Sequence, residues 1–467
     1  MEWIRLFLAL ALPALLGLQL VARLIPPTPA RRCLVAGYGL FAGLVLWPVL
    51  LRFWAACGLP LGFWAPLGFA LVLLGVMRGW PQRRSSIAPR MGASVVVLPL
   101  GSIAKLVCSL LVALLCFRLF SLAGEVIWRP LFPWDATMHW ATKARTWFEL
   151  QSFVPFVSND EWLSLGGEGV FTDHHADYPV TIPLWQYWLA TALGRWDPSL
   201  INLPWVLCYS SLGIGFYGQA SVSGASRTEA TVFTFFLLTL PLLNTHVALA
   251  GYADLFLAAA FGLTLMALHN GSQGGQPWQW RLMVLCAIGC LLIKNEGFFW
   301  MLTLLPAIWV ARRRDARSVL LATAAIAAAV PAVLWLFPAD IAVAGHSLDS
   351  LDLGYRTGAI TGIFRSLFVL GNWHLAMWYF VLLVALVAWR RPGLLVVAGP
   401  IVASLCAAFI LFMFLFTVTE YAVGAIRQTA VGRIGLHLMP AVIFLLLVMQ
   451  GQLRKIESSH TATRWVD

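Results

Sequence analysis

The chain has 467 residues, of which 60% are hydrophobic and 11% charged, with a mean hydropathy of +0.82 and a formal net charge of +11. This composition excludes an ordinary soluble enzyme, because the apolar runs leave no room for a separate soluble domain. The positive charge does not indicate a nucleic-acid partner, since arginine and lysine cluster in short loops, as they do in membrane proteins. We therefore expect an all-α, polytopic protein whose partner is membrane lipid.

The apolar segments predict about 13 spanning helices, because crossing a bilayer takes about 20 mostly apolar residues. In chain order they cover roughly 3–24, 34–55, 58–77, 100–122, 197–220, 228–247, 252–270, 280–293, 296–311, 318–337, 366–389, 393–417 and 434–451. This scheme requires that Pro183–Gly194 does not span, and about a dozen residues are too few to do so. Its LWQYWL composition is typical of a helix lying in the membrane interface.

A basic stretch, Arg78–Arg90, divides the first three segments from the rest. We expect residues 1–95 to form a three-helix extension and 96–467 to form the main transmembrane domain, with outer-face loops at 123–196 and 338–365. The positive-inside rule places the basic stretch in the cytoplasm. The polar segment after the helix at 100–122 then lies outside, in the periplasm of a bacterium or the lumen of the endoplasmic reticulum.

That polar segment, residues 134–188, opens with Asp135. Pro133 precedes it closely, so Asp135 sits in a loop or at a helix N-cap. Capping alone would explain an aspartate there. A carboxylate partly desolvated at a membrane surface is also a good general base for a hydroxyl or an amine, and the two roles are compatible.

The next residues predict an amphipathic interfacial helix over Met138–Leu150. Its polar face carries His139, Lys143 and Arg145. The two cations could snorkel to the headgroups, as they do on many surface helices. They could also bind a lipid-linked phosphate, which both residue types recognise well.

Further along the same segment lies the run His174-His175-Ala176-Asp177-Tyr178. Neighbouring histidines and an aspartate suggest a metal, but consecutive residues rarely point at one ion, and no HxxxH or CxxC spacing supports a site. Hydrogen bonding to a sugar or a phosphate is the favoured interpretation.

Three later motifs place ionisable groups at helix ends. Asp254 is at the start of a helix, where the helix dipole stabilises a negative charge and where an aspartate can act as an N-cap. Lys294 and Glu296 flank a tight turn and could hold a phosphate or neutralise each other. Arg433 and His437 are four residues apart and share one helix face.

A long loop, residues 338–362, contains Arg356, and long loops often serve as lids or binding loops. The predicted topology brings the ends of these segments to one outer face. The positions concerned are Asp135, Asp254, Lys294, Arg356 and Arg433.

In their order, these motifs resemble the GT-C glycosyltransferases, which transfer a sugar from a polyprenyl-phosphate carrier. That superfamily includes protein O-mannosyltransferases and the aminoarabinose transferases that modify lipid A. The pattern WDA…W…KA…DYP…YAD…KNEG resembles a bacterial branch and covers about residues 100–450. The chain departs from the family pattern in three ways. It has the single Asp135 where the family usually has a pair of acidic residues, and it has Pro179 and Pro183 where the family has two adjacent prolines. Three predicted helices also precede the part of the chain that resembles the family.

The resemblance implies a GT-C-like fold and a role for each motif. Asp135 would be the catalytic base. The donor phosphate would bind Lys143, Arg145, Lys294, Arg356 and Arg433. Sugar or acceptor would contact His139, His174, His175, Asp177, Tyr178, Asp254, Glu296 and His437.

The donor would be a lipid-linked sugar and the acceptor a glycan, a lipid or a protein, at the periplasmic face of a bacterial inner membrane. No cofactor and no metal ligand are expected, although a divalent metal stays open. Two other classes remain as alternatives: a transporter or flippase of lipid-linked sugars, and a non-catalytic membrane scaffold. Transporters usually show internal repeats and mid-membrane polar groups, and neither feature is evident in the sequence.

Overall fold

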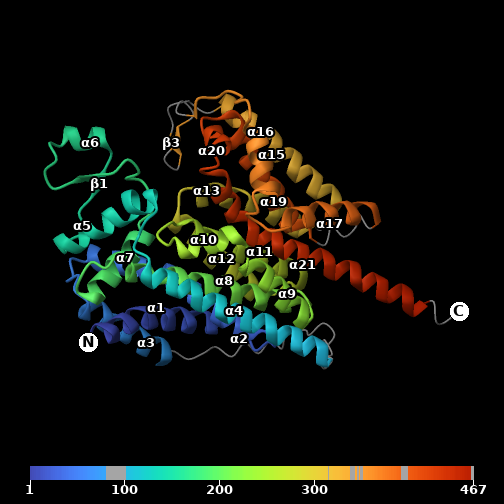
Figure 1. The fold of residues 1–467 in the computed structure, drawn as a ribbon, viewed down its shortest axis with the longest axis horizontal. Helices are drawn as coiled ribbons and strands as arrows, with labels where there is room; N and C mark the ends of the chain where they lie inside the picture. The colour runs from blue at the N-terminus through green and yellow to red at the C-terminus, as the bar shows by residue number, and fades with distance from the viewer. Residues whose placement is uncertain are drawn as a thin grey trace. The chain divides into compact units, whose positions relative to one another are not determined.

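The structure is a computed structural model that describes residues 1–79, 101–313, 315–336, 342–343, 346–347, 351–390 and 398–463. Its described regular structure is almost entirely helical (Figure 1), which confirms the all-α prediction. Two very short sheets are the exception. Strand β1 (Phe156–Val157) pairs in parallel with β2 (Phe171–Thr172), and β3 (Ala342–Val343) pairs antiparallel with β4 (His346–Ser347).

The chain forms two compact units. The first unit comprises Met1–Gly218, Asn244–Ala260 and Ile288–Asn295, and the second comprises Gln219–Leu243, Phe261–Ala287 and Glu296–Asp467. Helices α10 (Pro241–Ala248), α11 (Asp254–Gly274) and α12 (Pro277–Ile293) contribute residues to both. The predicted boundary between residues 95 and 96 lies outside the described residues.

The elements wholly within the first unit, besides β1 and β2, are α1 (Glu2–Leu24), α2 (Arg31–Ala56), α3 (Trp64–Gly79), α4 (Ser102–Trp128), the π-helix η1 (Ala136–Ala141), α5 (Thr142–Leu150), α6 (Asn159–Ser164), α7 (Thr181–Leu193) and η2 (Leu200–Asn202). Helix α8 (Pro204–Val222) runs from this unit into the second. The second unit adds α9 (Arg227–Leu238), α13 (Glu296–Leu302), α14 (Leu304–Arg313), α15 (Ala316–Leu336), α16 (Ala359–Phe364), the π-helix η4 (Arg365–Val369), α17 (Ala376–Arg390), α19 (Gly399–Val418), α20 (Ala422–Ile426) and α21 (Val431–Thr463).

Among the described residues, seven helices are long and apolar enough to cross a membrane, or eight if the bent pair α9–α10 counts as one span. They begin with α1, α2 and α4, continue with η2–α8 and α11, and end with α19 and α21. The protein is therefore built for a membrane, but the predicted count of about 13 is not reached.

Most of the shortfall arises from helix length and from breaks, since every predicted segment does contain a helix. Helices α3, α12 and α17 have 16, 17 and 15 residues, fewer than the roughly 20 that a bilayer requires. Helices α9 and α10 bend by 59° at the break before Pro241. Hydropathy averages over such breaks, so the sequence counted complete spans where the backbone is short or interrupted.

Helix α7 is not among the helices that could span, as predicted, and it is enclosed by the protein, so the prediction of an interfacial position is not tested. All 13 of its residues are buried within the first unit. The indoles of Trp185 and Trp188 donate to the carbonyl oxygens of Leu44 and Ala9, at 2.6 and 3.0 Å. A helix that is apolar on every side is typical of a core, and each buried indole N–H has a partner there.

Close backbone contact joins α1 to α2, which lie side by side (Figure 1). A Cβ atom added at Gly17 would clash with the backbone of Gly39 and Gly43, and one at Gly43 would clash with the carbonyl of Pro13. Small residues at such crossings allow helices in membranes to approach closely. This pair packs against α7, and α3 packs against α1, so the N-terminal helices support the core of the first unit.

The predicted cytoplasmic stretch from residue 80 to 90, residues 338–341, 344–345 and 348–350 of the long loop, and Arg391 lie outside the described residues.

Candidate functional site

The polar segment of the first unit starts with a turn of π-helix. Asp135 immediately precedes η1 and is half-buried, and its side chain makes no capping hydrogen bond there. Capping therefore does not account for this aspartate. The six residues of η1 form a π-helix, which has more residues per turn than an α-helix. Single π turns are frequent at functional sites. The residues of η1 lead into α5, which carries Lys143.

Asp173 is the centre of the polar cluster that follows. Its Oδ2 lies 2.7 Å from the Lys143 ammonium, and its Oδ1 lies 2.7 Å from Nδ1 of His139. The backbone N–H of His175 donates to the same Oδ1 at 3.1 Å. The side chains of Lys143 and Asp173 are only 1% and 3% exposed. This is a buried ion pair, which requires nearly complete hydrogen bonding to be tolerated.

These contacts set the charge states of the cluster. Burial by itself would raise the pKa of the Asp173 carboxyl, but hydrogen bonds from Lys143 and His139, together with the Lys143 charge, outweigh it and hold that pKa below its usual value. Burial lowers the pKa of the His175 imidazole, and the neighbouring His139 and His174 lower it further. The cluster therefore favours an ionised aspartate beside a neutral His175.

Aromatic rings pack against the two histidines that bond Asp173. Tyr178 stacks on His175 with ring centroids 4.5 Å apart and on Trp140 with centroids 4.9 Å apart. His139 meets the edge of His175 at 4.7 Å. Such stacking restricts the rings to one arrangement, so the segment after β2 is held rigidly over η1 and α5.

A second buried ion pair joins two motifs that are distant in sequence. The Lys294 ammonium lies 2.9 Å from Oδ1 of Asp254, and their side chains are 4% and 0% exposed. Lys294 therefore pairs with Asp254, at the first turn of α11. Next to it, the amide of Asn295 donates to the carboxylate of Asp177.

Gly251 completes the connection between the motifs. Its φ of +117° is a conformation that other residues rarely adopt, and a Cβ added there would lie 2.7 Å from Cβ of Ala136. The turn before Asp254 thus packs directly against the residue after Asp135. Only glycine allows both this backbone conformation and this contact.

Together these contacts form a closed chain that includes the residue after Asp135: Ala136 meets Gly251, Asp254 pairs with Lys294, Asn295 bonds Asp177, and the 173–178 segment returns to Lys143 in α5. Five sequence motifs thus form one assembly within the first unit. We call this assembly the motif ring.

The structure distributes the predicted phosphate ligands unequally. Lys143 and Lys294 are buried and paired with aspartates, so neither ammonium is presented at the surface. Arg145 is different: its side chain is 63% exposed, with Glu149 3.8 Å away. His174 and Asp177 are also exposed.

Four predicted residues belong to the second unit. Glu296 opens α13, Arg356 pairs with Asp352 in the long loop, and Arg433 and His437 lie in α21. The buried His437 accepts a hydrogen bond from Trp300 at 3.1 Å. Their assigned roles stay predictions.

Sequence reasoning missed Asp173 and Asn295. Its position directly before the paired histidines is the only feature of the sequence that points to Asp173 as a site residue. Its partners, Lys143 and His139, lie 30 and 34 residues earlier in the chain. Asn295 lies in the tight turn between Lys294 and Glu296, and its partner Asp177 is 118 residues away in the sequence. No local pattern identifies either contact.

Among the described residues, no group of three histidine, cysteine, aspartate or glutamate side chains is arranged to hold a metal ion. Comparisons of the chain with protein-family models, curated proteins and solved structures find no match.

Proposed function

We propose that this protein is a membrane-embedded glycosyltransferase that uses a polyprenyl-phosphate-linked sugar as donor, acting at the periplasmic face of a bacterial inner membrane. The motif ring is the observation that carries the proposal. It unites five of the motifs on which the GT-C resemblance rests, and it includes the residue that follows Asp135, a half-buried aspartate whose side chain makes no capping hydrogen bond. The GT-C-like fold is part of the same proposal.

In this proposal Asp135 accepts the proton of an acceptor hydroxyl or amine. The freed electron pair attacks the anomeric carbon of the donor sugar, and the bond from that carbon to the phosphate oxygen breaks. Polyprenyl phosphate leaves with the bonding electrons, and Arg145 stabilises its charge. The exposed His174 and Asp177 bond sugar hydroxyls.

Lys143 and Lys294 take a different role from the one the resemblance implies. Because each ammonium group forms an ion pair with a buried aspartate, we assign both lysines to holding the segments of the motif ring in place. Preorganised geometry of this kind lowers the barrier of a transfer reaction, since the reactants need not be ordered at the moment of reaction.

The test measures transfer of a radiolabelled sugar from a synthetic polyprenyl phosphate by the full chain in nanodiscs, with cell-envelope extract as the source of acceptors. Asp135→Asn should lower turnover about 10²–10⁴-fold, the usual cost of losing a general base, and leave thermal unfolding unchanged. Asp160→Asn, at an exposed residue of α6, is the matched control and should retain full turnover.

Near-wild-type turnover of Asp135→Asn would refute the role of Asp135. Movement of the intact lipid-linked sugar across the bilayer, without cleavage of its phosphate bond, would instead identify a flippase.

A further inference from the structure

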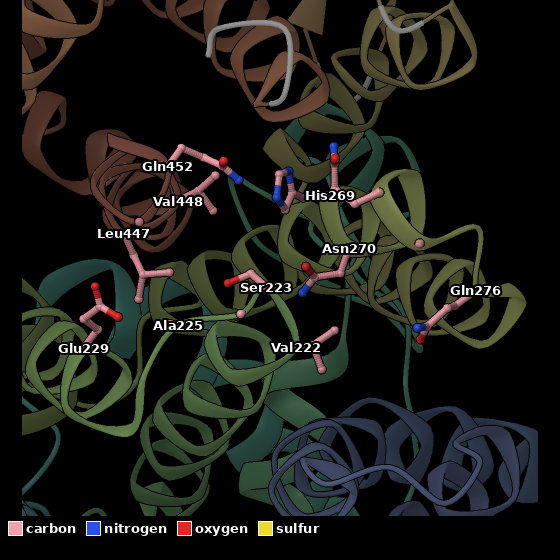
Figure 2. Close-up of a pocket in the computed structure, with 14 residues that line it drawn as sticks. Val222, Ser223, Ala225, Glu229, His269, Asn270, Gln276, Leu447, Val448 and Gln452 are labelled. Carbon is pink, nitrogen blue, oxygen red and sulfur yellow. The ribbon is translucent and has the colours of Figure 1, made fainter. Parts of the chain in front are cut away.

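A polar cavity lies within the second unit, and none of the residues that line it belongs to the motif ring. It has a volume of about 290 Å³ and is lined by 14 residues (Figure 2). They come from the end of α8 to the start of α9, from the C-terminal end of α11 and the turn after it, and from the middle of α21. This volume is near the lower end of the range for small-molecule sites, about 300–1,000 Å³. It therefore suits a group of monosaccharide size.

The lining is rich in neutral hydrogen-bonding groups. Four amide side chains take part, those of Asn270, Gln273, Gln276 and Gln452. Each amide can both donate and accept hydrogen bonds. The Nδ2 of Asn270 is held by both oxygens of Gln219, at 3.0 and 2.6 Å, which fixes the orientation of its amide.

His269 supplies the observation that points to a ligand. It lines the cavity, is only 2% exposed, and its Nδ1 has no hydrogen-bond partner. The buried Oε1 of Gln276 is also unpartnered. Buried polar atoms in proteins are nearly always hydrogen-bonded, and exceptions require an explanation. Two such atoms in one cavity indicate that something polar normally fills it.

Charge narrows the ligand class. Among the described residues that line the cavity, none is a lysine, an arginine or an aspartate. Glu229 is present, but Arg454 binds its Oε1 at 2.8 Å, and the backbone N–H of Ser226 binds its Oε2 at 2.8 Å. A phosphate would lack a cation, and a metal ion would lack free carboxylates. The lining also offers no tryptophan, tyrosine or phenylalanine on which a nucleobase could stack.

We propose that this cavity is a binding site for a neutral, polyhydroxylated group of monosaccharide size. Sugar hydroxyls, like the lining amides, each donate and accept, so one such group can satisfy His269, Gln276 and the Asn270 carbonyl together. The inference goes beyond the proposed transfer reaction and does not depend on it. The group could arrive as a soluble sugar or as the headgroup of a glycolipid.

The test uses saturation-transfer NMR on the full chain in nanodiscs, with methyl glycosides of glucose, mannose, galactose and arabinose as probes and glucose 6-phosphate as the charged counterpart. At least one neutral glycoside should bind, and the phosphate should bind at least tenfold more weakly.

Two variants locate the binding. Gly451 lines the cavity, and a Cβ there would meet no atom within 4 Å, so Gly451→Met should insert a side chain without a clash and weaken binding at least tenfold. Gly75→Met is the matched control, because Gly75 in α3 is equally uncrowded and lies in the other unit. His269→Phe keeps a ring against Phe444 but removes Nδ1, and it should weaken binding severalfold.

Failure of every neutral glycoside to bind would overturn the proposal, as would equal binding by the two methionine variants. Binding that survives Gly451→Met but is lost in Tyr178→Ala would place the sugar at the motif ring. That result would refute this inference while supporting the proposed function. If a glucosyl diacylglycerol in the nanodisc displaces the soluble probe, the bound group is the headgroup of a glycolipid. If the glycolipid does not displace the probe, the bound group is a soluble sugar.

Discussion

At the scale of single residues, buried charge dominates the first unit. A lysine and an aspartate with almost no exposed surface are stable only as a pair, because each would be an uncompensated charge without the other. If Lys143 serves to neutralise Asp173, its removal should lower the stability of the protein, whereas removal of a phosphate ligand should lower only the binding of the phosphate.

Lys143→Met should destabilise the protein by about 3–5 kcal/mol, because it leaves Asp173 charged, buried and without its cation. The double variant Lys143→Met with Asp173→Leu should recover most of this loss. Unfolding by denaturant in detergent measures both. Arg145→Ala is the control and should change stability by no more than about 0.5 kcal/mol, as is usual for an exposed residue.

A Lys143→Met protein of normal stability that fails to bind polyprenyl phosphate would contradict this structural role and restore Lys143 as a phosphate ligand.

The pKa shifts predict how stability depends on pH. The pKa of His175 and that of Asp173 are both lowered by folding, so the unfolded chain binds more protons than the folded one. Stability should then fall with decreasing pH, first below about 6.5 as the unfolded His175 becomes protonated, and again below about 3.9 through Asp173. Melting temperatures across pH 3 to 8 test this.

Replacing His175 with glutamine should flatten the first of these two steps and leave the second. An unchanged pH profile in His175→Gln would show that the step at the higher pH arises elsewhere in the protein.

At the scale of elements, packing is decided by small residues and by helix length. Gly43→Leu should force α1 and α2 apart, because the added side chain meets the Pro13 carbonyl. Overpacking of this kind costs about 1–3 kcal/mol. Gly68→Leu in α3 is the control: its position is open, so it should cost far less. Thermal unfolding of the two variants in detergent compares them, and equal melting temperatures would mean that the α1–α2 contact is looser than described.

At the scale of the whole molecule, the distribution of basic residues predicts which ends of the helices face which side of the membrane. The positive-inside rule predicts that residues 134–188 are outside and that Arg312–Arg317 is inside. Single cysteines at the exposed Glu168 and Arg313, in a background without the native cysteines, would report this. An impermeant maleimide added to intact cells should label the first and not the second. Labelling of the Arg313 position would overturn the topology and, with it, the periplasmic location of the proposed site.

The sequence by itself determined that this is a helical membrane protein, where nearly every helix lies, and which segment carries the concentrated polar residues. These properties follow from local hydropathy and composition, which a single chain displays directly. It identified Asp135, Asp254, Lys294 and Tyr178 as candidates, but it did not predict that Lys294 pairs with Asp254.

Tertiary structure alone decided the pairing of Lys143 with Asp173 and of Lys294 with Asp254, the contact of Gly251 with Ala136, and the burial of α7. It also decided which apolar helices are too short or too broken to span. Partners separated by 30 to 115 residues meet only after the chain folds back on itself. A charge that looks available in the sequence is therefore available in the protein only if no opposite charge has been buried beside it.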